Sequence, residues 1–167
     1  MYCTPAQLAT WFGADELGQA CSTTTPVDGG LMQLTIDGRD RSGYTPEQID
    51  AADQVLARIE ASIETGFFFI NTYLRSRYQL PLDQAAIDQS PLPRICGDLA
   101  RHSFHDDLPT SEIGERRKAA ISYLKDLQSG KAILSDSATQ TTTPTGSPQV
   151  VQGGVEAQFS TTQISGF

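Results

Sequence analysis

The stretch that decides the fold is residues 45–82, TPEQIDAADQVLARIEASIETGFFFINTYLRSRYQLPL. It opens with Thr45 and Pro46, a capping residue followed by a proline at the first helical position, where no N–H is needed. Apolar residues then recur at steps of three or four, as on the core-facing stripe of a helix. The stripe consists of Ile49, Ala52, Leu56, Ile59, Ile63, Phe67, Ile70 and Leu74. We therefore predict one long amphipathic helix that ends near Tyr78, with Gly66 marking either a bend or a break into two helices.

Shorter helices are predicted on both sides of this long one. Thr4 and Pro5 open a first helix that ends at Gly13, and a second short piece covers residues 14–20. A third helix is expected from Pro93 to about His105. A fourth begins at Thr110 or Ser111, after a break at residues 107–109, and ends at Gly130. The fold class is therefore mainly α, a small helical bundle around one long helix.

The segment 22–44 is predicted to be a loop, because it is rich in Thr, Gly and Asp. Within it, residues 31–36 (LMQLTI) alternate partly between apolar and polar, which favours a strand of a short β-hairpin. Residues 37–40 (DGRD) resemble half of a calcium-binding loop. They lack the remaining ligands of that pattern, so a turn is the preferred interpretation.

The composition changes after Leu134, which predicts two regions. Residues 1–134 form a helical domain, and residues 135–167 form a Ser/Thr/Gln-rich linker with an extended C-terminal arm. In the arm, residues 155–159 (VEAQF) alternate strictly but are too few to fold alone. The segment is expected either to add a strand to a neighbouring sheet edge or to remain a frayed tail.

The charge of the chain argues against binding to nucleic acid. The formal net charge is −8, and residues 1–57 carry eight acidic and two basic residues. Electrostatic binding to DNA or RNA requires a basic surface. An acidic surface instead suits a protein that lines a channel through which DNA passes without binding, because it repels the phosphate groups.

Cysteine content and hydropathy predict a soluble protein made in the cytoplasm. The three cysteines, Cys3, Cys21 and Cys96, are odd in number and widely spaced, which favours free thiols in a reducing compartment. No secretory signal pattern opens the chain. The longest apolar run, residues 66–70, is far too short to span a membrane.

The only histidines, His102 and His105, raise the question of a metal site with Asp106 and Asp107. Spacing of i and i+3 places both rings on one helical face. However, zinc requires three or four ligands in fixed geometry, and this HxxHDD spacing matches no known set. Two histidines near the negative end of a helix dipole are the preferred interpretation.

A nucleophilic site is also not predicted. Cys96 lies six residues before His102, nearly on the opposite side of the same helix, so the two do not form a thiol–base pair. No nucleophile elbow, phosphate loop or dinucleotide-binding motif occurs. The sequence therefore predicts no catalytic, cofactor-binding or metal-binding residue, and no cofactor.

Two groups of basic residues have two open interpretations each. Arg116, Arg117 and Lys118 follow Glu112 and Glu115, so local i,i+4 pairing is favoured over contact with an acidic neighbouring subunit. Arg75 and Arg77 either solvate the end of the long helix or reach across an interface.

Four segments together resemble the Mu-like phage head–tail adaptor family. They are MYCTPAQLATWFG at the N-terminus, YLRSRYQLPL at the end of the long helix, PRICGDLARHSFHDD, and ERRKAAISYLKDLQSGKAIL. The resemblance spans about residues 1–134. The chain departs from the pattern in an expanded loop at 22–44, an apparent insertion at 64–69, and a longer tail.

The resemblance implies a structural virion protein of the head–tail neck, assembled in the host cytoplasm and without catalytic residues. It implies a ring of identical subunits, expected to be a dodecamer, between the portal protein and a stopper or tail-terminator protein. Packaged DNA would pass through the lumen without sequence-specific binding, and no membrane is involved. Residues 150–164 are hypothesised to dock on a neighbouring subunit or on the portal.

Two other classes of function compete with this interpretation. One is a small helical metal- or thiol-dependent enzyme that uses His102, His105, Asp106 or Cys96. The other is a regulatory binding module, against which the acidic charge and the lack of a basic recognition helix both count.

Overall fold

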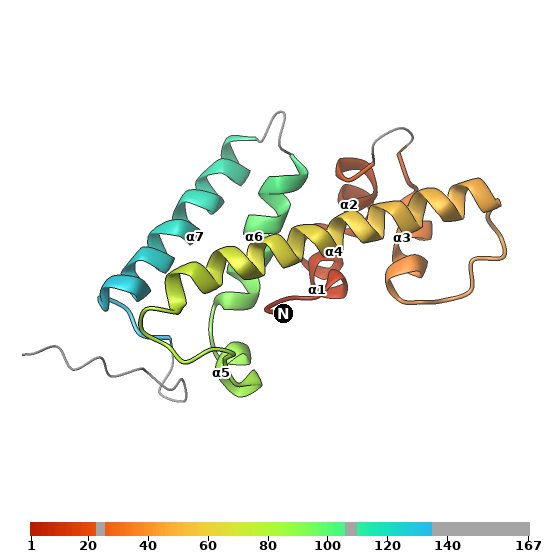
Figure 1. Ribbon diagram of the computed structural model, residues 1–167. Coiled ribbons are helices and arrows are strands. Elements are labelled where there is room, and N and C mark those ends of the chain that lie inside the picture. Colours follow the sequence, from red (N-terminus) through yellow and green to blue (C-terminus); the bar gives the residue numbers. More distant parts are fainter. Residues whose placement is uncertain (23–25, 106–109, 135–167) are drawn as a thin grey trace, which may run out of the picture.

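A single long helix forms the spine of the molecule (Figure 1). The computed structural model describes residues 1–22, 26–105 and 110–134, and these contain seven helices and no strand. The helices are α1 (Pro5–Phe12), α2 (Ala14–Ala20), α3 (Gly29–Ile36), α4 (Pro46–Leu74), α5 (Gln84–Asp88), α6 (Leu92–Phe104) and α7 (Ser111–Ser129). The mainly helical fold class predicted from the sequence is confirmed.

Helix α4 begins where the sequence predicted and runs unbroken for 29 residues. Its N-terminus is closed by a reciprocal capping box, in which the Gln48 amide donates to Thr45 Oγ1 and the Thr45 amide donates to Gln48 Oε1. Neither a bend nor a break is assigned at Gly66, which is buried within the continuous helix. The regular helix ends at Leu74, four residues before the predicted end, and a turn leads to Tyr78.

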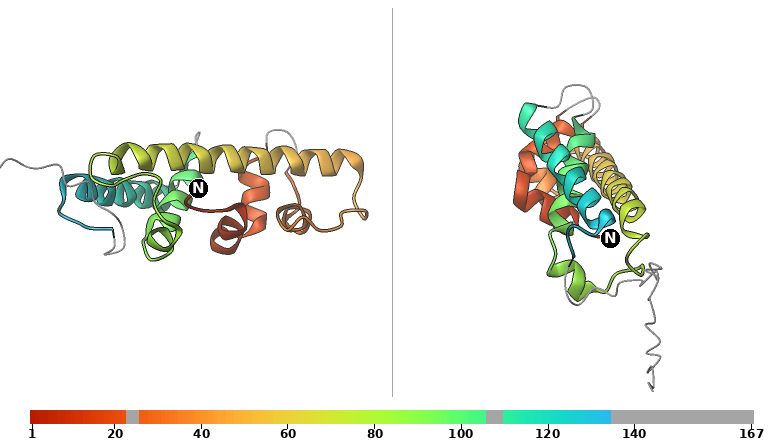
Figure 2. Two further views of the ribbon diagram at one scale, coloured as in Figure 1. Left: turned by 60° about the horizontal axis from the view of Figure 1, so that its bottom comes forward. Right: turned by 90° about the vertical axis from the view of Figure 1, so that its left-hand side faces the viewer.

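The buried face of α4 is covered by different helices along its length. Helices α6 and α7 pack on the half toward its C-terminus, and α3 packs toward its N-terminus, with α1 and α2 between (Figures 1 and 2). Five side chains of the predicted stripe are completely buried, namely Ala52, Ile59, Ile63, Ile70 and Leu74. Burial of each large side chain among them contributes about 1.5–3 kcal/mol, so this face is a substantial part of the stability of the fold.

Helix α6 lies close to both α4 and α1, and a glycine permits each approach. A Cβ atom on Gly66 would lie 3.4 Å from the carbonyl oxygen and from the Sγ atom of Cys96. A Cβ atom on Gly97 would lie only 2.8 Å from Cζ3 of Trp11 on α1. The second contact is shorter than a side chain can tolerate, so the Trp11 ring occupies the space that a larger residue at 97 would need.

The prediction of a β-hairpin strand at 31–36 is wrong, because these residues belong to helix α3. Asp28 caps the helix by accepting a hydrogen bond from the Leu31 amide at 3.1 Å. Leu31, Met32 and Thr35 are buried together on one helical face. A short apolar run fits strand and helix periodicities equally well, and packing against α2 and α4 decides between them.

The other predicted helices are confirmed, with small differences at their ends. Helix α2 has the predicted bounds, and α6 begins at Leu92, just before the predicted start. Thr110 caps α7, and Gly130 ends it in the left-handed conformation with φ of +79°. Helix α5 was not predicted, because five residues are too few to show a period. The predicted break at 107–109 lies outside the described residues.

The predicted arm at 135–167 also lies outside the described residues. The described chain ends at Leu134, which is buried and whose amide donates a hydrogen bond to the Tyr78 hydroxyl at 3.0 Å. The segment after α7 is thus held against the segment after α4. At the same end, the Arg77 guanidinium lies against Gly130, so Arg77 is half-buried within the chain.

The two glycine contacts predict opposite effects of the same substitution. Gly97→Ala should lower the free energy of unfolding by about 1–3 kcal/mol, because the new methyl group overlaps the Trp11 ring. Gly66→Ala is the matched control and should raise it by up to about 1 kcal/mol, because ordinary contact distance remains and helix propensity improves. Urea unfolding followed by circular dichroism measures both. Equal losses in the two variants would contradict the packing described here.

Candidate interaction surface

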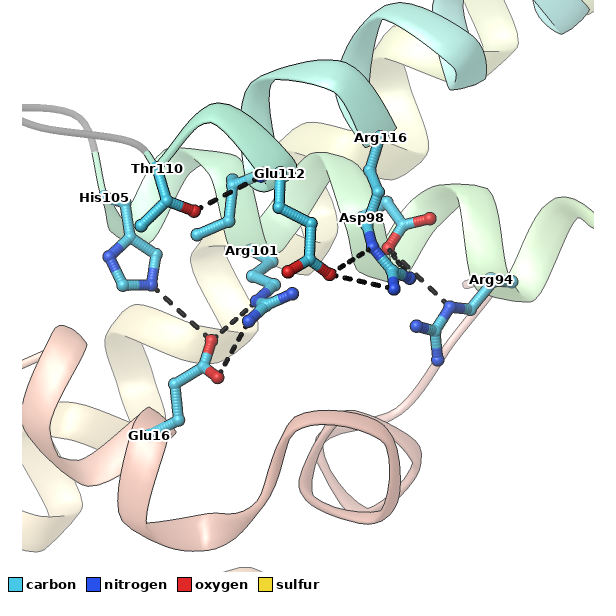
Figure 3. A network of polar contacts seen from close by, with 9 residues as sticks. Glu16, Arg94, Asp98, Arg101, His105, Thr110, Glu112 and Arg116 are labelled. Atoms are coloured by element: carbon cyan, nitrogen blue, oxygen red, sulfur yellow. Dashed lines mark hydrogen bonds and ion pairs between the residues drawn. The ribbon is translucent and has the colours of Figure 1, made fainter.

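A partly buried ion pair joins α2 to α6 (Figure 3). Arg101 donates two hydrogen bonds to Glu16, from Nε to Oε1 at 2.6 Å and from Nη2 to Oε2 at 2.9 Å. His105 Nε2 lies 3.5 Å from the same Oε1 atom. Side-by-side bonding of this kind matches the planar guanidinium to the carboxylate and is stronger than a single contact. Glu16 and His105 are therefore engaged in holding the fold.

The arginines of α6 also cover the aromatic residues of α1. The Arg101 guanidinium carbon lies 4.6 Å from the ring centre of Phe12. The corresponding atom of Arg94 lies 5.1 Å from the centre of Trp11 and 4.9 Å from that of Phe12. A cation over an aromatic face is attracted by the ring quadrupole. Three helices are therefore joined through the charged side of α6.

Asp98 connects α6 to α7 through two arginines (Figure 3). Its Oδ1 atom lies 3.6 Å from Nε of Arg94 and 3.9 Å from Nη1 of Arg116. Burial away from water raises the pKa of the Asp98 carboxyl, and the nearby positive charges of Arg94, Arg116 and Arg101 lower it by less. The net direction is upward, so the ionised form of Asp98 is held in an unfavourable environment.

The basic cluster at 116–118 follows the favoured interpretation of local pairing. Arg116 Nη2 lies 3.0 Å from Glu112, and Lys118 Nζ lies 2.7 Å from Glu115. The second pair is exposed on both sides, and such pairs contribute little to stability. Arg75, at the end of α4, is exposed. These side chains do not converge on a common site.

The residues considered for catalysis or metal binding are not gathered into a site within the described ranges. There, no three His, Cys, Asp or Glu side chains are placed to share a metal ion, while Asp106 and Asp107 lie outside these ranges. The Cys96 thiol is buried and turned toward α4, where Sγ lies 3.6 Å from the Ile63 carbonyl oxygen. All three cysteines are free thiols, as predicted, and all three are buried. The DGRD segment forms a turn with Gly38 at φ of +65°.

One apolar part of the described surface remains uncovered. Met1 is 61% exposed and Phe68 is 59% exposed, beside a half-buried Phe67. The rings of Phe67 and Phe68 lie 5.5 Å apart, and Tyr2 lies 5.0 Å from Phe67. Phe68 is the exposed member of this aromatic group, since Phe67 is half-buried and Tyr2 is buried. A large exposed aromatic residue beside other apolar side chains is typical of contact surfaces between proteins.

Two hollows adjoin Met1 on this surface. The first, which we call the uncharged hollow, has a volume of about 390 Å³. It is lined by residues 1–2, by Phe67 and Asn71 of α4, by residues 80–82, and by Gln84 and Ile87 of α5. The second, the acidic hollow, has a volume of about 520 Å³ and includes Glu60 and Glu64. Both are of the size that receives a few side chains of a partner.

This surface was not identified from the sequence, although a signal for it was present. Phe68 lies two positions from both Gly66 and Ile70, and therefore on the side of α4 opposite the buried stripe. An aromatic residue on the solvent face of a helix departs from the amphipathic pattern. The hollows themselves could not be predicted, because each combines N-terminal residues with α4, and the uncharged hollow adds α5 and the segment between α4 and α5.

Comparison with protein families decides the identity of the chain. Residues 2–152 match the model of the family described as bacteriophage Mu, Gp36. The chain belongs to this family. The resemblance to a Mu-like phage family is thereby confirmed, and the protein is a bacteriophage protein. The match extends beyond residue 134, where the predicted resemblance ends. Comparison with curated proteins gives no match.

No helix in the described part of this phage protein is both long and apolar enough to cross a membrane. The longest, α4, carries charged residues along its exposed face, including Asp53, Glu60 and Glu64. Its amphipathic pattern is that of a helix packed on a protein core.

We predict that lysine at position 101 cannot reproduce the two hydrogen bonds that Arg101 donates to Glu16. Arg101→Lys should lower the free energy of unfolding by about 1–2 kcal/mol, because an ammonium group cannot bond both carboxylate oxygens in the same plane. Lys118→Ala is the control and should change it by less than about 0.5 kcal/mol, because that pair is exposed. Urea denaturation of both variants tests this, and similar losses would show that the first pair is unimportant.

The raised pKa of Asp98 predicts a pH-dependent effect of neutralising it. A carboxyl whose pKa is raised on folding stabilises the folded state at low pH and loses this contribution as pH rises through the folded pKa. Asp98→Asn removes that dependence. The stability of the variant relative to the parent should therefore be greater at pH 7 than near pH 4, as measured by denaturation at both values. A relative stability that falls with rising pH would show that the arginines outweigh burial.

Proposed function

We propose that the protein is a head–tail adaptor, a structural virion protein of the phage neck. In this proposal its copies form a ring between the portal protein and a stopper or tail-terminator protein, and DNA passes through the lumen. The observation that carries the proposal is the uncovered aromatic surface around Met1 and Phe68, on a chain of a bacteriophage family. A surface of this kind is stabilised by burial against another protein.

The mode of action in this proposal is association rather than catalysis. Two of the side chains that first suggested chemistry lie within the packing of the fold, since His105 Nε2 lies 3.5 Å from Glu16 and Cys96 faces the Ile63 carbonyl. An identical contact repeated head to tail around an axis closes into a ring when the rotation between copies is a whole fraction of a turn. An elongated subunit with a continuous spine is suited to such lateral packing.

The charge of the chain supports the passage of DNA. The formal net charge is −8, and the exposed face of α4 carries Asp50, Asp53, Glu60 and Glu64. Phosphate groups are repelled by acidic surfaces, so a ring of such subunits guides DNA without retaining it.

The test is the copy number of this protein in purified virions relative to the portal subunit. Quantitative mass spectrometry with isotope-labelled reference peptides measures both proteins in the same digest. We expect a ratio near one, because a ring matched to the portal repeats its symmetry. A major capsid peptide serves as the internal control for recovery of intact particles.

Absence of the protein from intact particles would refute a structural role in the neck. A ratio far above one would also refute it, because a single ring cannot hold many copies for each portal subunit. In either case His102 and His105 would be the first residues to test for another activity.

A further inference from the structure

We propose that residues 150–159 of one copy dock in the uncharged hollow of a neighbouring copy. This inference rests on the proposed function, because it requires copies of the chain to lie side by side. It assigns the hollow a specific occupant, a second copy's C-terminal segment, in place of an unspecified partner.

The hollow offers an apolar site in which no lining side chain is charged; the one charge beside it is the N-terminal ammonium of Met1. Its lining combines the rings of Tyr2 and Phe67 with the aliphatic side chains of residues 80–82 and Ile87. Polar side chains are limited to Tyr2, Asn71 and Gln84, and the Tyr2 hydroxyl is hydrogen-bonded to Asn71 Oδ1. A volume of about 390 Å³ is sufficient for a few side chains but too small for a folded element.

The C-terminal segment matches this chemistry. Within residues 150–159 the only charged side chain is that of Glu156, so the segment brings a single charge to the hollow. Its apolar side chains are Val150, Val151, Val155 and Phe159. Glu156 is repelled by Glu60 and Glu64 of the acidic hollow, which favours the uncharged one.

The place where the described chain ends brings this segment to the hollow. The Leu134 amide is bonded to the Tyr78 hydroxyl, and Tyr78 is two residues before Leu80 in the lining. The chain therefore leaves the described structure beside the rim. Residues 135–149 are fifteen residues, which span up to about 50 Å when extended.

Fifteen residues are long enough to reach the hollow of a neighbouring copy. The 29-residue α4 is about 44 Å long at 1.5 Å per residue, so fifteen residues extend as far as the longest element of the subunit. Docking in the same copy needs only a small part of that length, because the exit lies at the rim of the hollow. The spacing is suited to a hollow on the adjacent copy.

Photo-crosslinking in the full-length protein tests the proposal. Phe159 is replaced by p-benzoylphenylalanine, and isotopically light and heavy chains are mixed in equal amounts before assembly and irradiation. We expect crosslinked peptides that join residue 159 of one isotope to residues 1–2, 67–71 or 80–87 of the other. The same photoreactive residue at position 167 is the matched control and should give few of these products.

Three results would overturn the proposal. The first is crosslinks confined to single-isotope pairs, which would indicate docking within one copy. The second is crosslinks from residue 159 to other parts of the chain. The third is a crosslinking yield at position 159 no higher than at position 167. The virion copy number is an independent measurement. A ratio near one without these crosslinks refutes the docking alone, whereas the crosslinks in a protein absent from virions refute the adaptor function alone.

A substitution provides a second readout. Phe159→Ser should weaken self-association by about tenfold or more, because an apolar ring no longer leaves water on docking. Phe167→Ser is the control and should change it by less than about twofold. Sedimentation equilibrium of the full-length chains measures both, with circular dichroism to confirm equal helix content. Equal affinities in the two variants would contradict the assigned occupant.

Discussion

The close contact of α6 with α4 at Gly66 is the constraint on which the rest of the structure depends. Without a side chain at 66, the backbone of α6 at Cys96 comes within van der Waals reach of the spine. From that position α6 extends its charged side toward α1, α2 and α7, where Arg101 and Asp98 make their contacts. A residue larger than alanine at this crossing would displace α6 and separate all of these pairs together.

The charged residues of α6 illustrate why residue type alone does not reveal function. Arg94, Arg101 and Asp98 are partly buried, and each is matched by an opposite charge or an aromatic face. Burying a charge without a partner is unfavourable, so paired charges in a helical domain usually indicate packing constraints. The functional signal lies instead in the side chains that packing leaves uncovered, above all Phe68.

Assembly through a surface such as this combines two terms of opposite sign. Burial of exposed aromatic and aliphatic atoms favours association, whereas ordering a segment upon docking opposes it. A ring repeats each favourable contact around its axis, so contacts of modest strength become sufficient once the ring closes. In the proposed ring, the net negative charge would repel the phosphate groups of DNA that passes through the lumen.

Local signals in the sequence were sufficient for most of the helices. The capping residues Thr4 and Thr45, the apolar stripe of α4 and the stop at Gly130 depend on neighbouring residues only, and each was predicted from the sequence. These features can be predicted from the sequence because hydrogen bonds at helix ends and the 3.6-residue period are local properties of the chain. The family resemblance depends on the same segments and is confirmed by the match to the phage family.

Only the tertiary structure decided the remaining features, because they depend on residues distant in the sequence. Residues 31–36 have an ambiguous pattern and become helical by packing against α2 and α4. The pairing of Glu16 with Arg101 joins positions 85 residues apart, and no local period indicates it. The uncharged hollow likewise combines the N-terminus, α4 and α5. The sequence by itself thus determined where most of the helices begin, whereas the packing between them decided that residues 31–36 are helical, which side chains are paired and which surface stays open.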